Sequence, residues 1–302
     1  MHASSRTHTT LVQVRGPWSL AVSRAFWEGF TPAALPSGAG SDDELRTVFL
    51  AEADWSRAQA TVTQHGDTAH IEVSGAGDLD AAAAQVTRFL ALDVDAGGWP
   101  EVAGRDPVIA RAQQALPGLR PCGFHSPYEA AAWAVLSQRI RVVQAAQLRA
   151  DLVRRHGEDG AFPPPDRLRA LDLDLPGRKT EYLHAVAEAA ADGLLDGVTL
   201  RALDPATAVE RVQQVRGLGP FAAELVVLRG ANAPDGLPRH EAQLTAEITE
   251  QYGPHVDLGT LSERWRPYRT WAAVHLRVLR ERRIREISGS PAARAGRGSP
   301  RR

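Results

Sequence analysis

Short runs of alternating apolar and polar side chains occupy the first part of the chain, from residue 10 to about residue 75. Such alternation is typical of strands that bury one face. The expected strands cover residues 10–14, 46–51, 58–64 and 68–73. The last two flank His65-Gly66-Asp67, which favours a tight turn, so the pattern predicts an antiparallel hairpin within a sheet.

The apolar spacing becomes helical after these strands. Asp78 is a candidate N-cap for a helix through residues 81–90, which would pack its apolar face on the sheet. A segment rich in Pro, Ser, Gly and Asp at residues 33–43 is expected to be a loop. We therefore assign residues 10–98 to a small N-terminal antiparallel domain of strands and helices.

Residues 99–288 are predicted to form a mostly helical domain. Asp106 and Asp204 each precede a proline, and Ser126-Pro127-Tyr128-Glu129 has the spacing of a capping box, so each starts a helix. A break is expected near residues 137–140. The expected helices cover residues 106–115, 126 to that break, 142–156, 166–170, 179–192, 204–215, 221–228, 240–252, 258–264 and 267–285. The fold class is therefore α+β.

The amino-acid composition limits the class of protein to which this chain can belong. The 302 residues are 43% hydrophobic and 24% charged, which is typical of a globular protein with room for two cores. No apolar run is long enough for a membrane span, and the first residues lack an apolar signal core, so we expect a cytoplasmic protein, nucleoid-associated if bacterial. Residues 289–302 contain mainly Gly, Ser, Pro, Ala and Arg, and we expect a disordered tail.

The cysteine content and the distribution of basic residues limit the kinds of site that the chain can form. The single cysteine, Cys122, excludes an internal disulfide, a Cys-based zinc site and an iron–sulfur cluster, and is expected to be a small buried side chain. The formal net charge is −1, so the chain as a whole does not resemble a nucleic-acid binder. Basic residues nevertheless concentrate between 139 and 155 and between 264 and 285, and such a local basic face is sufficient for DNA contact.

One stretch, Val215-Arg216-Gly217-Leu218-Gly219-Pro220-Phe221-Ala222-Ala223-Glu224, joins two predicted helices through two glycines and a proline. Glycine permits positive φ and close backbone approach, and proline suits the first turn of a helix. The N–H groups at such a corner can hold a phosphate without a basic side chain. Taken alone, the same pattern also fits an ordinary turn.

This stretch resembles the hairpin of the helix-hairpin-helix DNA glycosylase superfamily. Three further segments resemble its 3-methyladenine DNA glycosylase II (AlkA-like) group, in the same order and spacing. They are Pro117-Gly118-Leu119-Arg120-Pro121 with Ser126-Pro127-Tyr128-Glu129 and Ser137-Gln138; Phe162-Pro163-x-Pro165; and Trp265-Arg266-Pro267-Tyr268-Arg269-x-Trp271-Ala272. The resemblance implies a small antiparallel domain followed by a helix-hairpin-helix domain.

The resemblance also implies an activity. A monofunctional glycosylase of base excision repair would hydrolyse the N-glycosidic bond of alkylated purines of the 3-methyladenine type, acting as a monomer on double-stranded DNA with damaged bases and without a membrane or a redox cofactor. The family hairpin would contact DNA through Gly217, Leu218, Gly219 and Pro220, and its carbonyls could bind a monovalent cation. No other metal is expected.

The family places a catalytic carboxylate just beyond the hairpin, in the pattern Asp-x-x-Pro-x-x-Asp. Here Asp235 and Pro238 match, while the catalytic position holds Glu241. The carboxylate would stabilise an oxocarbenium-like sugar. The extra methylene moves it by about 1 Å or more unless the backbone compensates, and misplacement on that scale can cost on the order of 10²-fold in rate. Alternatively, Glu241 is a solvated residue at a helix start; His240 is a poorer substitute, because imidazole carries no negative charge.

Base and gap contacts follow from the same resemblance. Phe221, Leu225 and Tyr128 would line the base pocket, with ordinary core packing as the alternative for each. Bifunctional relatives carry a lysine where this chain has Phe221, so no strand-cleaving step is expected. Gln138 and Arg139 match the pair that fills the gap left by an everted base, although they could also form an exposed polar turn.

Other aromatic residues carry less functional weight. Trp265, Trp271 and His275 recur at helical spacing and are expected in the core. An aromatic residue that the family places late in the last helix is Arg277 here, which indicates a remodelled pocket. A catalytically weak relative that binds damaged DNA remains the alternative function, and a helical scaffold for protein partners is disfavoured. The sequence leaves open which damaged bases are removed.

Overall fold

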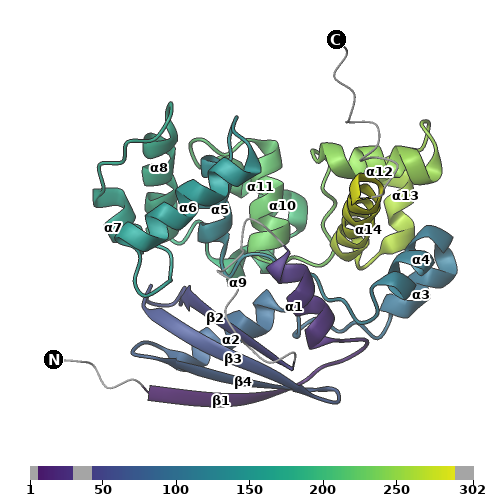
Figure 1. Ribbon diagram of the computed structural model, residues 1–302, viewed down its shortest axis with the longest axis horizontal. Coiled ribbons are helices and arrows are strands. Elements are labelled where there is room, and N and C mark those ends of the chain that lie inside the picture. Colours follow the sequence, from purple (N-terminus) through teal and green to yellow (C-terminus); the bar gives the residue numbers. More distant parts are fainter. Residues whose placement is uncertain (1–5, 30–42, 290–302) are drawn as a thin grey trace, which may run out of the picture.

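A computed structural model describes residues 6–29 and 43–289 (Figure 1). The loop predicted at residues 33–43 and the tail predicted at 289–302 therefore lie outside the described residues, apart from Asp43 and from Gly289, which ends the last helix. Within the described ranges, no helix combines the length and the apolar character needed to cross a bilayer. The architecture is a small antiparallel sheet followed by helices, as the sequence predicted.

The sheet has four antiparallel strands in the order β1-β4-β3-β2. They are β1 (Arg6–Gln13), β2 (Glu44–Leu50), β3 (Arg57–His65) and β4 (Thr68–Gly75). His65 pairs with Thr68 across the predicted tight turn, and this register sends alternate side chains of β3 and β4 to one buried face. Helix α2 (Leu79–Phe89) packs on that face, with Asp78 accepting a bond from the Ala81 N–H at its start.

A helix that the sequence analysis missed, α1 (Leu20–Glu28), precedes β2. The Ser19 hydroxyl caps its first turn by accepting a bond from the Val22 N–H. Leu20 and Trp27 are buried against the sheet side of the molecule, while Phe26 remains partly buried. Figure 1 shows α1 between the sheet and the helical part of the chain, so this helix can contribute to both.

The predicted helices are present, and two short ones, α3 and α9, were not foreseen. The helical part contains α3 (Trp99–Arg105), α4 (Pro107–Ala115), α5 (Pro127–Leu136), α6 (Val142–His156), α7 (Pro165–Ala170), α8 (Lys179–Ala191), α9 (Gly197–Ala202), α10 (Pro205–Gln213), α11 (Pro220–Leu225), a π-helical turn (Val226–Gly230), α12 (Ala242–Tyr252), α13 (Leu258–Ser262) and α14 (Arg269–Gly289). The expected break between α5 and α6 is confirmed. Helix α14 extends to Gly289, beyond the predicted end at 285.

The helices form two apolar clusters. One surrounds α5, whose residues are all buried, and includes α8, α10 and α11. The other joins α3 and α4 to α12–α14 around Trp99, Trp265 and Trp271, which confirms that the late tryptophans are core residues. His275 is also buried there, and burial lowers its pKa to about 4. Figure 1 shows α5–α11 on one side and α12–α14 on the other, above α1.

The capping box predicted at the start of α5 is only half formed. The Ser126 hydroxyl accepts a bond from the Glu129 N–H at 3.2 Å, but the Glu129 side chain does not return to the cap. Instead, its carboxylate accepts a bond from Arg149 on α6 at 2.7 Å. Burial alone would raise the pKa of Glu129, yet its contacts with His125 and Arg149 lower that pKa to about 2. Tertiary contact has replaced the local one.

Buried Asp106 connects α4 to the far end of the second cluster. Besides capping α4 through the Val108 N–H, its carboxylate accepts bonds from the Tyr252 hydroxyl at 2.9 Å and the Trp265 Nε1 at 2.8 Å. A buried acceptor that serves several donors leaves each of them unsatisfied when it is removed. Asp106 therefore connects the start of α4 with the end of α12 and with the segment that precedes α14.

We predict that Asp106→Ala lowers the free energy of unfolding by about 3 kcal/mol or more, because it removes a cap and strands two buried donors. Asp204→Ala is the matched control, since Asp204 also caps a helix with proline at the first position but is exposed. That variant should lose only about 1 kcal/mol. Urea unfolding of both variants measures the difference, and equal losses would contradict the role of Asp106.

Candidate active site beside the hairpin

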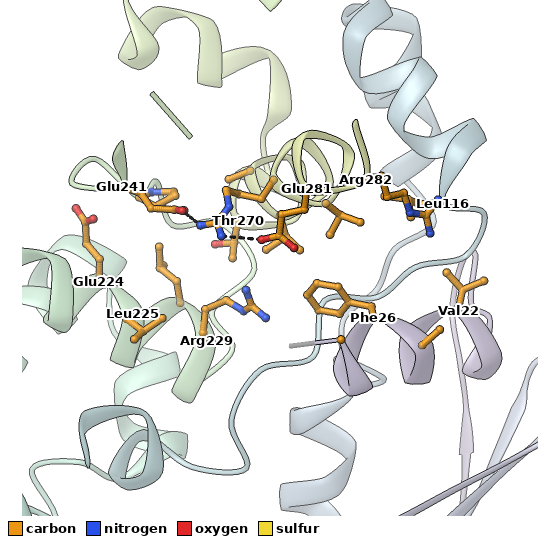
Figure 2. Close-up of a pocket in the computed structure, with 18 of the residues that line it drawn as sticks. Val22, Phe26, Leu116, Glu224, Leu225, Arg229, Glu241, Thr270, Glu281 and Arg282 are labelled. Atoms are coloured by element: carbon orange, nitrogen blue, oxygen red, sulfur yellow. Dashed lines mark hydrogen bonds and ion pairs between the residues drawn. The ribbon is translucent and has the colours of Figure 1, made fainter. Parts of the chain in front are cut away.

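A cavity of about 270 Å³ lies where α1, the hairpin helix α11 with its π-helical turn, and α14 meet (Figure 2). One wall is apolar and comes mainly from Val22, Ala25 and Phe26 of α1 with Ala273 and Val274 of α14. Charged side chains line the remainder together with further apolar residues such as Phe221, Leu225 and Leu228. The ionic side chains that line the cavity are Glu224, Arg229, Glu241, Arg277, Glu281 and Arg282. Three carboxylates and three guanidinium groups therefore share one partly enclosed space.

Glu241 occupies the N-cap position of α12 and lines this cavity. Its side chain accepts no bond from the first turn of its own helix, unlike a typical capping carboxylate. Instead, the carboxylate forms an ion pair with Arg277 of α14, and only 17% of the Glu241 side chain is exposed. The predicted catalytic residue is thus in a pocket, held by a residue from another helix.

The loop that leads to Glu241 is fixed by a second carboxylate. Glu224, on α11, accepts bonds from the backbone N–H groups of Arg239 and His240, each at 3.0 Å. It also lies 2.8 Å from Nδ1 of the His240 ring, so the imidazole is bound to Glu224 while half of it remains exposed. The buried Glu224 carboxylate therefore determines where the backbone enters α12.

Asp235, the first residue of the family pattern, has a structural contact. Its carboxylate pairs with Arg269 at 3.0 Å and with Arg266 at 2.9 Å, at the beginning of α14. Close by, the Thr270 hydroxyl donates to the Gly236 carbonyl and accepts from the Gly236 N–H. These bonds attach the loop before Glu241 to the helix that carries Arg277.

Arg229 lies in the π-helical turn that continues α11. Its guanidinium stacks over the Phe26 ring at 5.3 Å and donates to the Cys122 carbonyl at 2.7 Å. Burial is the main cause that lowers the pKa of Arg229 to about 10; Arg277 lowers it further and Glu281 opposes the shift. Burial also raises the pKa of Cys122 to about 12, which agrees with the prediction of an inert buried thiol.

The hairpin has the expected shape, but its two glycines differ. Gly217 has φ +92°, and a Cβ there would lie 2.4 Å from the Tyr182 ring, so both conformation and space require glycine. Gly219 has φ −84°, which any residue adopts, and a Cβ there would meet nothing within 4 Å. Leu218 is buried, whereas Gly219 and Pro220 are exposed. The corner therefore offers bare backbone to a partner at Gly219.

The turn between α5 and α6 is attached to this hairpin. Gln138 donates from Nε2 to the Gly217 carbonyl at 2.8 Å, and buried Lys179 donates to the Gln138 carbonyl at 2.7 Å. Arg139 is exposed at the tip of the turn with φ +57°. Gln138 thus supports the hairpin, while Arg139 is the member of the pair that can reach outward.

Phe221 and Leu225, two of the residues predicted for the base pocket, line this cavity, and the Phe221 side chain is 49% exposed. The prediction that Tyr128 belongs to the base pocket is wrong. Tyr128 is fully buried within α5, against Trp55 and Phe162, and its hydroxyl donates to the Pro163 carbonyl at 2.9 Å. All residues of α5 are buried, and none of them lines the cavity.

Sequence reasoning missed Phe26, Arg229 and Glu281 as cavity residues. Phe26 was missed together with α1, although Ser19 before the spacing Leu20, Ser23 and Trp27 is a usable helix signal. Arg229 follows Leu225 by four positions and Glu281 follows Arg277 by four positions, so helical spacing was a usable signal for both. Their position depends on how α11 and α14 face each other.

Comparisons with known proteins agree with this architecture. No family model matches the chain. It is 30% identical over 223 residues to DNA-3-methyladenine glycosylase 2 of Escherichia coli (strain K12), which covers 69% of this chain and 76% of that protein. It is 26% identical over 208 residues to DNA-3-methyladenine glycosylase of Bacillus subtilis (strain 168), which covers 62% of this chain and 69% of that protein.

Among solved structures, 3-methyladenine DNA-glycosylase from Archaeoglobus fulgidus superposes with a TM-score of 0.70 at 17% identity, covering 90% of this chain and 98% of that one. At this identity the similarity shows the fold. The sequence relationship to the Escherichia coli protein shows the family. The chain therefore belongs to the DNA-3-methyladenine glycosylase 2 (AlkA-like) group of the helix-hairpin-helix DNA glycosylases.

Proposed function

We propose that this protein is a monofunctional DNA glycosylase of base excision repair that hydrolyses the N-glycosidic bond of alkylated purines in double-stranded DNA. One observation carries the proposal: Glu241 places a carboxylate in the cavity, at a helix start just beyond the glycine hairpin. The relatives from Bacillus subtilis and Escherichia coli are named as DNA-3-methyladenine glycosylases, which supports the same substrate class.

The chemistry requires an everted base, because the glycosidic bond is inaccessible inside the stacked duplex. Phe221 and Leu225 line the cavity from the hairpin helix α11, and Phe26 lines it from α1. Departure of the base leaves positive charge on the sugar, and a carboxylate in a partly enclosed site stabilises that charge more strongly than it would in water. Glu241 would provide this stabilisation while water attacks the anomeric carbon.

A hydrolytic route also fits the residues of the cavity. A lyase step needs an amine that forms a Schiff base with the sugar. Of the described residues that line the cavity, none is a lysine, and the Lys179 ammonium donates to the carbonyls that end α5. The proposal therefore assigns no strand cleavage to this protein.

DNA would be held by the hairpin and by the turn attached to it. The Gly219 backbone is open to solvent at the start of α11, where a phosphate can approach the N–H groups. Arg139 would enter the gap left by the everted base. A monovalent cation at the hairpin carbonyls remains part of the proposal, although the Gly217 carbonyl already accepts a bond from Gln138. The protein would act as a monomer in the cytoplasm.

Glu241→Gln should lower the single-turnover rate of base release from methylated duplex DNA by about 10² or more, because the negative charge is lost. Free base is measured by chromatography, with 3-methyladenine, 7-methylguanine, hypoxanthine and ethenoadenine substrates. Glu250→Gln is the control, since Glu250 lies on the same helix but outside the cavity. Release that survives in Glu241→Gln would remove the catalytic assignment, and no release by the wild type from any substrate would favour a binding module.

Gly219→Asp should weaken binding to an abasic-analogue duplex by about tenfold or more, because one repulsive charge near a phosphate costs on the order of 1–4 kcal/mol. The fold should tolerate the change, since a Cβ at this position meets nothing within 4 Å. Gly104→Asp is the matched control: a Cβ there also meets nothing within 4 Å, and Gly104 lies on α3, away from the hairpin. Fluorescence anisotropy reports the affinities. Equal affinity of Gly219→Asp and the wild type would contradict a phosphate contact.

A further inference from the structure

We propose that Arg277 is a positioning residue for the catalytic carboxylate, and that Glu281 allows it to act without cancelling the negative charge of the site. This inference rests on the proposed function, because it concerns how Glu241 would stabilise the sugar. It is carried by the ionic cluster Glu241–Arg277–Glu281, in which Arg277 pairs with Glu241 on one side and with Glu281 at 2.9 Å on the other. Figure 2 shows these two contacts as dashed lines inside the cavity.

Glu241 needs an external partner because its own helix does not hold it. No N–H of the first turn of α12 donates to its side chain. A glutamate has one more rotatable bond than an aspartate, so more conformational freedom is lost when its side chain is immobilised. In the structure, the Arg277 contact is what fixes the carboxylate at the cavity wall. Arg277 therefore offsets the extra length of the glutamate.

The orientation of Arg277 is fixed in turn. Its Nη1 faces Glu241 and its Nη2 donates to Glu281, one turn further along α14. A planar guanidinium can serve two carboxylates at once from a fixed fork, whereas an ammonium acts as a single point charge. Helix α14 itself packs against α12, and the Arg269–Asp235 contact attaches it to the loop before Glu241. The position of the Glu241 carboxylate is thus set by α12, which begins at Glu241, and by α14, which carries Arg277.

Charge explains the part played by Glu281. A lone Glu241–Arg277 pair would be neutral and would offer a sugar cation little attraction. The second carboxylate leaves the three-residue cluster with one net negative charge. Of the other guanidinium groups in the cavity, Arg229 is directed to the Phe26 ring and the Cys122 carbonyl, and Arg282 donates to the Ala115 carbonyl. The cluster can therefore hold Glu241 in place and still stabilise developing positive charge.

The test is a double-mutant cycle between residues 277 and 241. Arg277→Met should reduce the maximal single-turnover rate of base release by about 10- to 100-fold, the range expected for a displaced catalytic group. The DNA concentration for half-maximal rate should change less than twofold. In a Glu241→Gln background, which lacks the charge that Arg277 pairs with, the same change should cost less than threefold. Arg277→Lys should recover part of the rate, and Glu281→Gln should lower the rate less than Arg277→Met does.

Arg283→Met is the matched control on the same helix. Arg283 is 31% exposed against 33% for Arg277, and it also pairs with two carboxylates, Glu247 and Glu250, but it lies outside the cavity. Its rate of base release should equal that of the wild type. Circular dichroism and binding to the abasic-analogue duplex confirm that each variant is folded.

The outcomes separate this inference from the proposed function. If the wild type releases base but Arg277→Met loses the same factor in both backgrounds, Arg277 does not act through Glu241 and the inference is wrong. A shift in the half-maximal DNA concentration without a change in maximal rate would also overturn it, because Arg277 would then bind DNA. If the wild type releases no base from any methylated duplex, the proposed function fails, and the inference fails with it.

Discussion

The buried carboxylate of Glu224 is the constraint on which the site depends. It accepts bonds from two successive backbone N–H groups before α12 and from the His240 ring. A buried carboxylate without such donors would be costly, so the loop and the hairpin helix must stay together for either to be stable. The carboxylate of Glu241 reaches the cavity because the residues directly before it are held to α11.

A second connection links DNA contact to the same region. Gln138 bonds to the hairpin carbonyl at Gly217, and Lys179 bonds to the end of α5 below the turn that presents Arg139. The element proposed to hold a phosphate and the residue proposed to fill the gap are therefore parts of one hydrogen-bonded unit. Their relative position is set before DNA binds, which reduces the ordering that binding requires.

The cavity is unusual in being both apolar and ionic. Isolated charges in a partly enclosed space are unfavourable, and here each of the three carboxylates has an ionic or hydrogen-bonding partner. Arg229 is paired with an aromatic ring and a carbonyl, Arg277 with two carboxylates, and Glu224 with backbone donors. This arrangement keeps the pocket close to neutral overall while leaving local negative charge beside Glu241. The charged side chains of this pocket must therefore keep their positions for each ion pair to be maintained.

The sequence alone determined the features that near neighbours encode. Alternation and capping residues located the sheet and the predicted helices, the glycine spacing located the hairpin, and the resemblance placed Glu241, Phe221 and Leu225 near the site. Only the tertiary structure decided what surrounds them. Tyr128 lies outside the cavity because α5 is enclosed on all sides, and the Glu129 carboxylate bonds to Arg149 instead of capping its own helix. Phe26, Arg229 and Glu281 line the cavity because α1, the π-helical turn and α14 meet there. Local patterns report on residues a few positions apart, whereas a pocket between α1, α11 and α14 depends on how those helices pack.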